Sequence, residues 1–336
     1  MRKPFLHRLL ALSTLLAISF GLCISHIASA TKITFAEDSA MITQANMVLK
    51  ESLGMNYYAE VADSVIENGT TLAMNFTMND TNGNPYTTTV NGIQETTTQK
   101  YVFTLNEIAP QLLAENIKAE LVLLNESTKA TKLLDTYDGY SVKAYLLSLL
   151  PGASSTLKTL VYSILSYGAA SQAYLGMSNT ITNDLTIDAK FVSPVHSDNT
   201  TNEIYNDEDN PAKGTQIFGM GVWFDRVITP YLTVYVANGD LESLTVKTSK
   251  SILELKYYQD YADGALYRAE VFTLKPTEYS SSRNVTLTIN NVKQRVSVCL
   301  NDYLYTIYNT KNNTQEEKDL AYTVYNYGVA ATAYVG

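Results

Sequence analysis

Tyrosine is the residue type that most clearly offers chemistry in this sequence. The chain contains 25 tyrosines, against nine phenylalanines and a single tryptophan, Trp223. Tyr257, Tyr258 and Tyr261 lie close together in the stretch LELKYYQDYADGALY (253–267), beside a predicted turn. An aromatic ring stacks on the apolar face of a sugar, and a tyrosine hydroxyl adds a hydrogen bond. These three tyrosines and Trp223 are therefore our candidate ligand-binding residues.

A structural interpretation competes with a glycan platform. Trp223 and Phe224 are neighbours in the sequence, so a central strand would bury them on its two opposite faces. The tyrosines would then line a sheet and keep their hydroxyls near water. We favour this structural interpretation for Trp223 and for the tyrosine cluster, and the exposure of the rings decides between the two.

Other catalytic and metal-binding residue types are scarce. Beyond residue 30, Cys299 is the only cysteine and His196 the only histidine. One cysteine allows neither an internal disulfide nor a cysteine-based metal site, and its surroundings (SVCLNDYL) indicate a packed thiol in a buried helix. No spacing singles out a carboxylate pair for glycoside hydrolysis. We therefore expect no enzyme, no catalytic residue, no metal and no cofactor.

The first thirty residues have the features of a secretory signal peptide. A basic start with Arg2 and Lys3 precedes an apolar run (9–24), and small residues at Ala28 and Ala30 fit a cleavage site before Thr31. An uncleaved membrane anchor is the alternative, for which the apolar run is short. After cleavage 21 basic and 33 acidic residues remain, a net charge of −12. We expect a secreted protein with no transmembrane segment and no nucleic-acid partner.

Two nearly identical stretches indicate how the chain is organised. VYSILSYGAASQAYLG (161–176) and AYTVYNYGVAATAYVG (321–336) align without a gap and share seven residues of sixteen. Both predict amphipathic helices that end at a glycine, with small residues that let another backbone approach closely. A ligand site built from tyrosine faces is the alternative. The structural repeat motif consists of Tyr167, Gly168, Ala170, Ala173 and Tyr174, and of Tyr327, Gly328, Ala330, Ala333 and Tyr334.

Weaker matches upstream extend the repeat. A shorter helix is expected before each long one, in 140–152 and 296–309. Strand patterns pair 101–110 with 270–279, and 115–125 with 283–291. The stretch 53–63 aligns with 218–228, which places Tyr57 opposite Trp223.

These patterns predict an α+β fold made of two tandem copies of an antiparallel β-sandwich or β-sheet module, each ending in a two-helix hairpin. The first β-rich repeat is expected over 31–176 and the second over 215–336, after the signal peptide of 1–30. The linker and acidic loop span 177–214, and we expect a strand of the second repeat at 184–192. Its NDEDNP stretch does not fit the spacing of a calcium loop, so we expect a solvated acidic loop.

The stretch YSVKAYLLSLL followed by LVYSILSYGAASQAYLG resembles a largely uncharacterised module of secreted and cell-surface proteins from anaerobic gut Gram-positive bacteria. In that module a Ser-Val-x-x-Tyr helix precedes a YGAAxQxY helix. The resemblance covers nearly all of the chain beyond residue 30, twice, but the second copy lacks the glutamine found at Gln172. It implies an extracellular, modular role beside carbohydrate-active or adhesive domains, and it implies no catalytic residue.

Three classes of function remain for such a chain. The first is a non-catalytic secreted or cell-surface module that binds polysaccharide or a surface protein. The second is a structural spacer or assembly unit, and the third is a glycan-acting enzyme. An exposed row of aromatic residues on one sheet favours the first, featureless stacked domains favour the second, and a cleft with two carboxylates of perturbed pKa favours the third.

Overall fold

The computed structural model describes residues 39–49, 52–196, 205–206, 214–224 and 226–335. Within these ranges the chain forms four antiparallel four-stranded sheets and four α-helices, an α+β fold. The proposed signal peptide, and the acidic loop apart from two residues of a short strand, lie outside the described residues.

The N-terminal part contains two of the sheets. One sheet has the strand order β1 (Ala40–Leu49), β2 (Leu53–Val61), β6 (Tyr101–Leu105) and β5 (Ile93–Gln94). The other has the order β4 (Pro85–Asn91), β3 (Thr70–Asn79), β7 (Ile117–Asn125) and β8 (Thr131–Tyr140). Helices α1 (Val142–Ser148) and α2 (Ser155–Tyr174) follow, and the side chains of Ser141 and Ser154 cap their first turns.

The C-terminal part contains the other two sheets. One has the order β10 (Gln216–Phe224), β11 (Ile228–Ala237), β14 (Gly264–Glu270) and β13 (Lys256–Tyr261). The other has the order β12 (Thr245–Thr248), β15 (Ser282–Ile289), β16 (Val292–Cys299) and β9 (Tyr205–Asn206). Helices α3 (Leu300–Asn309) and α4 (Gln315–Val335) close this part.

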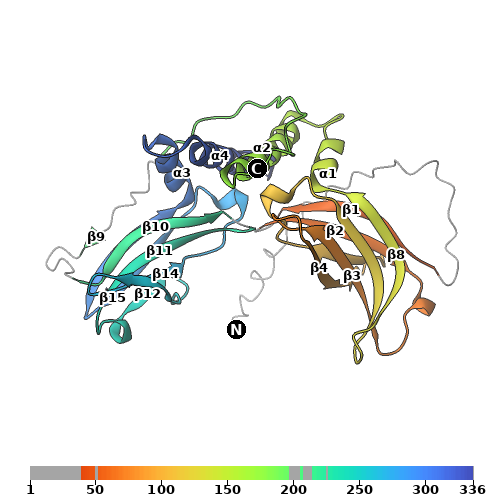
Figure 1. Ribbon diagram of the computed structural model, residues 1–336, viewed down its shortest axis with the longest axis horizontal. Helices are drawn as coiled ribbons and strands as arrows, with labels where there is room; N and C mark the ends of the chain where they lie inside the picture. Colours follow the sequence, from red (N-terminus) through yellow and green to blue (C-terminus); the bar gives the residue numbers. More distant parts are fainter. Residues whose placement is uncertain (1–38, 50–51, 197–204, 207–213, 225, 336) are drawn as a thin grey trace, which may run out of the picture.

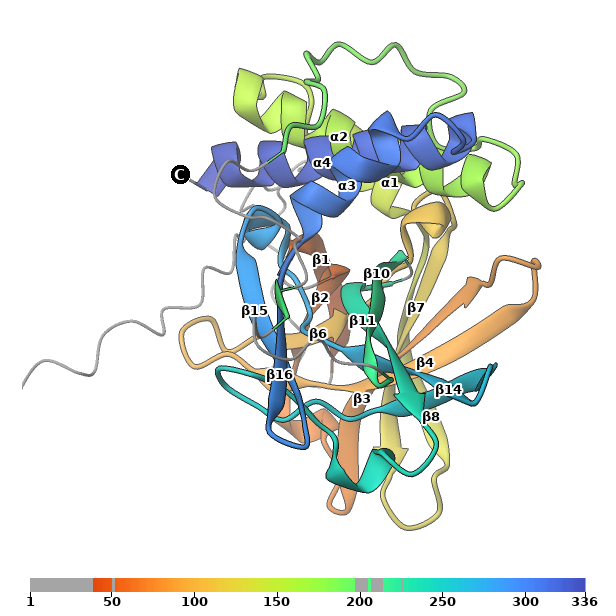
Figure 2. The ribbon, with the colours of Figure 1, turned by 90° about the vertical axis from the view of Figure 1, so that its left-hand side faces the viewer.

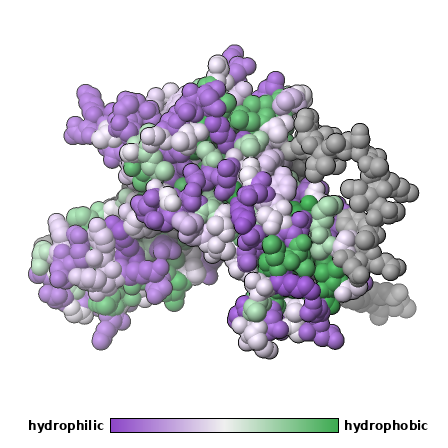
Figure 3. All heavy atoms as spheres, turned by 45° about the vertical axis from the view of Figure 1, so that its right-hand side comes forward, coloured by the Kyte–Doolittle hydropathy of each residue, from purple (hydrophilic) through white to green (hydrophobic). Residues whose placement is uncertain are grey.

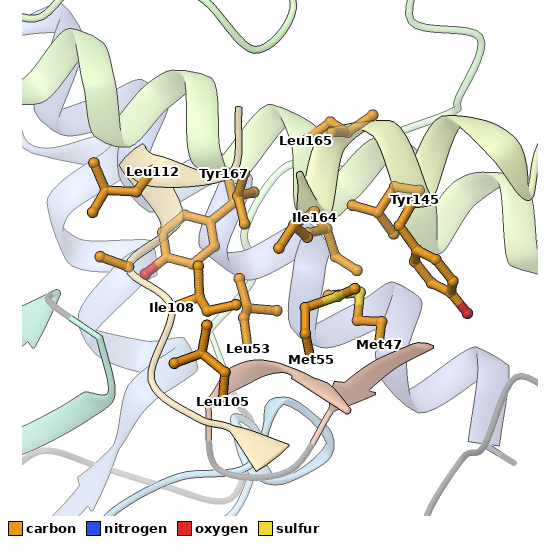
Figure 4. Packing of buried hydrophobic residues seen from close by; sticks show 14 of the residues in the cluster. Met47, Leu53, Met55, Leu105, Ile108, Leu112, Tyr145, Ile164, Leu165 and Tyr167 are labelled. Carbon is orange, nitrogen blue, oxygen red and sulfur yellow. The ribbon is translucent and has the colours of Figure 1, made fainter. Parts of the chain in front are cut away.

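The four helices lie together at one end of the sheets. Figures 1 and 2 show α2 and α4 side by side above both sets of strands. The buried face of α2 packs on the first sheet and its following turn, where Ile164 and Tyr167 meet Leu53, Leu105 and Ile108 (Figure 4). A second core fills the space between the two sheets of the C-terminal part. Each core is lined by the alternate residues of facing strands, as the two-residue period of a strand requires.

The glycines of the repeat motif allow the long helices to pack closely on the segments beneath them, whereas Ala173 and Ala333 are exposed and make no such contact. A Cβ atom added to Gly168 would lie 2.7 Å from the carbonyl oxygen of Pro110, in the short 3₁₀ turn Pro110–Leu112. A Cβ atom added to Gly328 would lie 2.5 Å from a ring carbon of Tyr279. Close approach of another backbone is therefore confirmed at Gly168, where the neighbour is a 3₁₀ turn, whereas Gly328 fits against a tyrosine side chain. Helix α2 ends before Gly176, whose φ of +69° is the left-handed conformation typical of a helix C-terminus.

The strand expected at 184–192 is absent, and this prediction was wrong. Residues 185–196 form no strand and lie instead along the helices. The amide of Asn326 on α4 takes the place of a strand partner: Val192 N–H donates to its Oδ1 at 2.8 Å, and its Nδ2 donates to the Val192 carbonyl at 2.9 Å. The backbone N–H and C=O of Val192 are thus satisfied by a helix side chain and not by a strand partner.

Two upstream alignments are also wrong in register. The stretch 53–63 forms β2, the second strand of its sheet, whereas 218–228 covers the edge strand β10, so Tyr57 and Trp223 do not correspond. Val102–Leu105 lies in β6, but the identical letters at Val271–Leu274 follow the end of β14. Hydrogen bonds from Val271 N–H to Pro230 and from Leu274 N–H to Ile228 set the register there. These hydrogen bonds, and not the shared four-residue sequence, determine which residues lie opposite each other.

Candidate ligand-binding face

The sheet β10-β11-β14-β13 has one face on the core and one face turned outward. Along β11, Leu232, Val234 and Val236 belong to the buried core of the C-terminal part. Tyr231, Thr233 and Tyr235 alternate with them and therefore point to the opposite face. We call this outward surface the aromatic face. Seven of its side chains make ring or cation–π contacts in two groups: Trp223, Tyr231, Tyr258 and Arg268 in one, and Phe218, Tyr235 and Tyr261 in the other.

Arg268 lies among three aromatic rings at one end of this face. Its guanidinium carbon is 3.5 Å from the ring centroid of Tyr258, 4.8 Å from that of Trp223 and 4.9 Å from that of Tyr231. Trp223 and Tyr231 also pack on each other, with centroids 4.8 Å apart. We call these four residues the arginine cage. Cation–π contacts hold the guanidinium in place.

The guanidinium of Arg268 has no anionic partner among the described residues. Its Nε atom is buried and makes no hydrogen bond. The terminal nitrogens form no ion pair within 4.0 Å in the described part of the chain, and they are not buried. On this sheet the carboxylate of Glu270 pairs instead with Lys256 at 3.0 Å. The cage therefore presents a fixed cation at the protein surface.

A second aromatic group continues the face toward the other end of the sheet. The ring of Tyr261 contacts those of Phe218 and Tyr235 edge-on, with centroids 5.3 and 6.0 Å apart. The Tyr235 hydroxyl donates to Asp263 Oδ1 at 2.5 Å. This hydrogen bond raises the pKa of Tyr235 and lowers the pKa of Asp263. We call Phe218, Tyr235 and Tyr261 the distal group.

Two glycines of β10 leave no side chain on the surface between the arginine cage and the distal group. The ring of Tyr231 lies directly over Gly221, where an added Cβ atom would be 2.3 Å from the ring. Nothing lies within 4 Å of an added Cβ atom at Gly219, which pairs with Thr233. The backbone of β10 is therefore accessible at Gly219, beside the rings.

The exposure of the rings contradicts the burial that we favoured for Trp223. β10 is an edge strand, and Trp223 is 43% exposed on it. Tyr258 and Tyr261 are also exposed and lie on the aromatic face. Tyr257 is exposed as well, but its ring packs against Tyr267 on the opposite face of the sheet, so the structure separates it from the other three candidates.

Sequence reasoning missed Arg268, Tyr231 and Phe218. The period-two pattern of β11 contains the signal for Tyr231, because this ring alternates with buried aliphatic residues. Arg268 carries no comparable signal, since its cage is assembled from β10, β11, β13 and β14. A bulge between Tyr257 and Gln259 turns Tyr258 toward Arg268, and bulges are hard to see in a sequence.

The corresponding outward surface of the sheet β1-β2-β6-β5 has a different character. There Asn46 and Asn56 both donate to the Tyr58 hydroxyl, at 3.2 and 3.5 Å, and Thr104 donates to Asn56 at 2.8 Å. This surface carries a network of hydrogen-bonded polar side chains, in which the buried Oδ1 of Asn46 has no partner. The exposed aromatic layer is therefore a feature of the C-terminal part.

Other chemistry-bearing residues occupy structural positions. Cys299 is buried, as the sequence indicates, and its thiol contacts the Tyr279 carbonyl at 3.7 Å. His196 Nδ1 lies 3.9 Å from the buried carboxylate of Asp302. In the described ranges, three or more His, Cys, Asp or Glu side chains nowhere gather in a metal-binding group. Hydrogen bonds from neighbouring groups lower the pKa of Asp80, Asp184 and Asp263.

Comparisons with protein-family models and with curated proteins find no match to this chain. None of the helices in the described residues is long and apolar enough to cross a membrane.

Proposed function

We propose that this chain is a non-catalytic secreted or cell-surface module that binds glycan at the cell exterior through its aromatic face. The observation that carries the proposal is the group of exposed rings on one face of a sheet, with Trp223 and Tyr258 at one end and Tyr261 at the other. Such large exposed apolar rings are costly in water unless they serve a contact. Sugar rings stack on aromatic faces, while hydroxyl groups of tyrosines supply hydrogen bonds.

Exposed hydrophobic residues also occur outside the aromatic face. Figure 3 shows hydrophobic residues in patches between hydrophilic ones on the side of the molecule that it displays. Exposed large hydrophobic residues elsewhere, such as Ile93 and Leu133, are not joined to one another by aromatic contacts. The aromatic face differs because its rings contact one another within two groups, one of which also holds Arg268.

We further propose that the module arose by tandem duplication, each copy ending in a two-helix hairpin. The order β1-β2-β6-β5 in the first part parallels β10-β11-β14-β13 in the second. In both parts a 3₁₀ turn with a proline at its start packs on the glycine of the long helix, through Pro110 and through Tyr279. The signal peptide, the extracellular location and the resemblance to surface modules of gut bacteria belong to the same proposal.

Binding to insoluble polysaccharides and to peptidoglycan tests the proposal. The chain from Thr31 onward contains every residue that the structure describes and is the form to use. We expect saturable retention that Trp223→Ala and Tyr258→Ala abolish while circular dichroism stays unchanged. Tyr257→Ala is the matched control, because it removes an exposed ring from the same strand but from the other face. Absence of retention on every material would contradict the proposal.

A further inference from the structure

The geometry points to an anionic saccharide, a sugar that carries a carboxylate or sulfate group, as the ligand of the arginine cage. This inference rests on the proposed function and names the class of glycan. It starts from one property of the aromatic face: the Arg268 guanidinium lies among its rings and makes no ion pair within 4.0 Å with a described residue, because Glu270 on the same strand pairs with Lys256.

Among the Arg and Lys side chains of the described residues, Arg268 alone has a buried nitrogen atom without a hydrogen bond. Lys256 on the same sheet is paired with Glu270 at 3.0 Å, and Lys100 in the first part with Glu60 at 2.9 Å. Burying part of a guanidinium without a hydrogen-bond acceptor is unfavourable, so the cage costs stability in the free protein. The terminal nitrogens of Arg268 are not buried, so a ligand that brings acceptor oxygens can pair with them.

The cage also fixes the direction of the guanidinium. Tyr258 lies on one side of it at 3.5 Å, and Trp223 and Tyr231 lie within 5 Å. A guanidinium held in this way has lost much of its rotamer freedom before a ligand arrives. Its planar fork matches the two oxygens of a carboxylate or the oxygens of a sulfate. Surface lysines would attract an anion without this orientation.

The neighbouring rings would bind the sugar ring itself, while Arg268 would bind its charged substituent. Trp223 and Tyr258 are each more than two-fifths exposed, so their free surface can meet the apolar face of a sugar ring. A neutral sugar would use the rings alone, and a small inorganic anion would use Arg268 alone. A sugar with a negatively charged substituent uses both, which is why we infer this class.

The negative net charge of the protein should confine the binding of an anionic saccharide to the region around Arg268. The chain has a formal net charge of −9, so an anionic polymer is repelled by most of its surface. An anionic saccharide would therefore bind where Arg268 offsets this repulsion. Added salt would weaken the contact, although less than for a fully exposed pair.

Titration of Trp223 fluorescence tests the inference directly, because this residue is the only tryptophan in the chain and belongs to the cage. The probes are two matched pairs: oligogalacturonate with its methyl ester, and dextran sulfate oligomers with dextran. We expect an anionic member of at least one pair to bind about tenfold to a hundredfold more tightly than its neutral partner. The pair that shows the difference identifies carboxylate or sulfate as the group bound.

Variants of Arg268 give an independent measurement. Arg268→Met should remove the preference for the anionic probe, and Arg268→Lys should recover only part of it because the fork is lost. Arg283→Met is the matched control, since Arg283 also lies over a ring, that of Phe272, in the same part of the chain but outside the cage.

The outcomes separate this inference from the proposed function. Equal affinity for the anionic and neutral members of both pairs would overturn the anionic preference and leave glycan binding intact. Failure of every saccharide to bind, while the folded protein gives its normal circular dichroism, would overturn both. The comparison of probes uses the unmodified protein, so it holds even if Arg268→Met does not fold.

Discussion

The ring of Tyr167 on α2 stacks on the ring of Tyr327 on α4, with centroids 5.9 Å apart and planes 22° from parallel. Both residues stand at the same position of the repeated YG motif and precede the glycines that fit against the 3₁₀ turns. Tyr279 packs edge-on against Tyr327 at 6.1 Å. The repeated motif therefore joins the helices of the two parts to each other and to the strands below.

Replacement of Gly168 by alanine should destabilise the protein. In a solvent-exposed helix the change would stabilise by up to about 1 kcal/mol. Here the new Cβ atom would meet the Pro110 carbonyl at 2.7 Å and Leu113 Cδ1 at 2.8 Å, and we expect a loss of about 1–3 kcal/mol. Urea unfolding measures this difference.

Ala173→Gly provides the control for this helix, because Ala173 is exposed one turn further along α2. It should lose about 1 kcal/mol through helix propensity alone. A Gly168→Ala variant that is as stable as the unmodified protein would show that the helix and the 3₁₀ turn are not in close contact.

Buried tyrosines predict a loss of stability at alkaline pH. Burial raises the pKa of Tyr145 and of Tyr303 to about 12, and that of Tyr327 still further. Below pH 10 both the folded and the unfolded chain keep these protons, so stability does not change. Between pH 10 and 12 the unfolded chain releases them while the folded chain retains them, so the free energy of unfolding falls.

Urea unfolding at several pH values between 9 and 11.5 measures this fall. Tyr145→Phe and Tyr303→Phe should each make the pH dependence shallower, because one buried hydroxyl is removed. Tyr261→Phe is a control at an exposed position. A free energy of unfolding that stays constant over this range would contradict the prediction.

Much of the fold could be predicted from local pattern, because strands and helices follow hydrophobic periods of two and 3.6 residues. The helices around Tyr167 and Tyr327, the strand at 117–125 and the turn after Tyr261 all form where the pattern indicates. The failures at 184–192 and in the alignment of 53–63 with 218–228 have a common cause. Each depends on which distant group satisfies the backbone hydrogen bonds, and a sequence does not display that partner.

The candidate site was predictable only in part for the same reason. Aromatic composition drew attention to Trp223, Tyr258 and Tyr261, but it also selected Tyr257, which lies on the other face. Whether a strand is central or at an edge decides the exposure of Trp223, and strand order is a property of the whole sheet. Arg268 could not be assigned to the site from the sequence, because its cage is formed by residues of four different strands.

The segment 184–196 should become sensitive to protease when Asn326 is changed. Asn326→Leu removes both hydrogen bonds to Val192 and keeps a side chain of similar volume on α4. We expect trypsin to cleave after the exposed Lys190 several-fold faster, since local opening governs proteolysis of a folded chain. Asn309→Leu, at an exposed position on α3, should cleave at the unmodified rate. Equal rates for the two variants would show that Asn326 does not hold the segment.

A bulky residue at Gly219 should block the aromatic face without unfolding the protein. No atom lies within 4 Å of a Cβ atom added there, and the φ of this glycine is one that other residues adopt, so Gly219→Leu should alter stability by less than about 1 kcal/mol. The new side chain would stand beside Thr233, between the arginine cage and the distal group. Retention of a glycan that spans the face should fall by about tenfold or more, because stacking on both groups becomes impossible. Gly219→Ala serves as the graded control, since one methyl group obstructs far less. A Gly219→Leu variant that binds as well as the unmodified protein would place the ligand on the cage alone and show that the distal group does not take part.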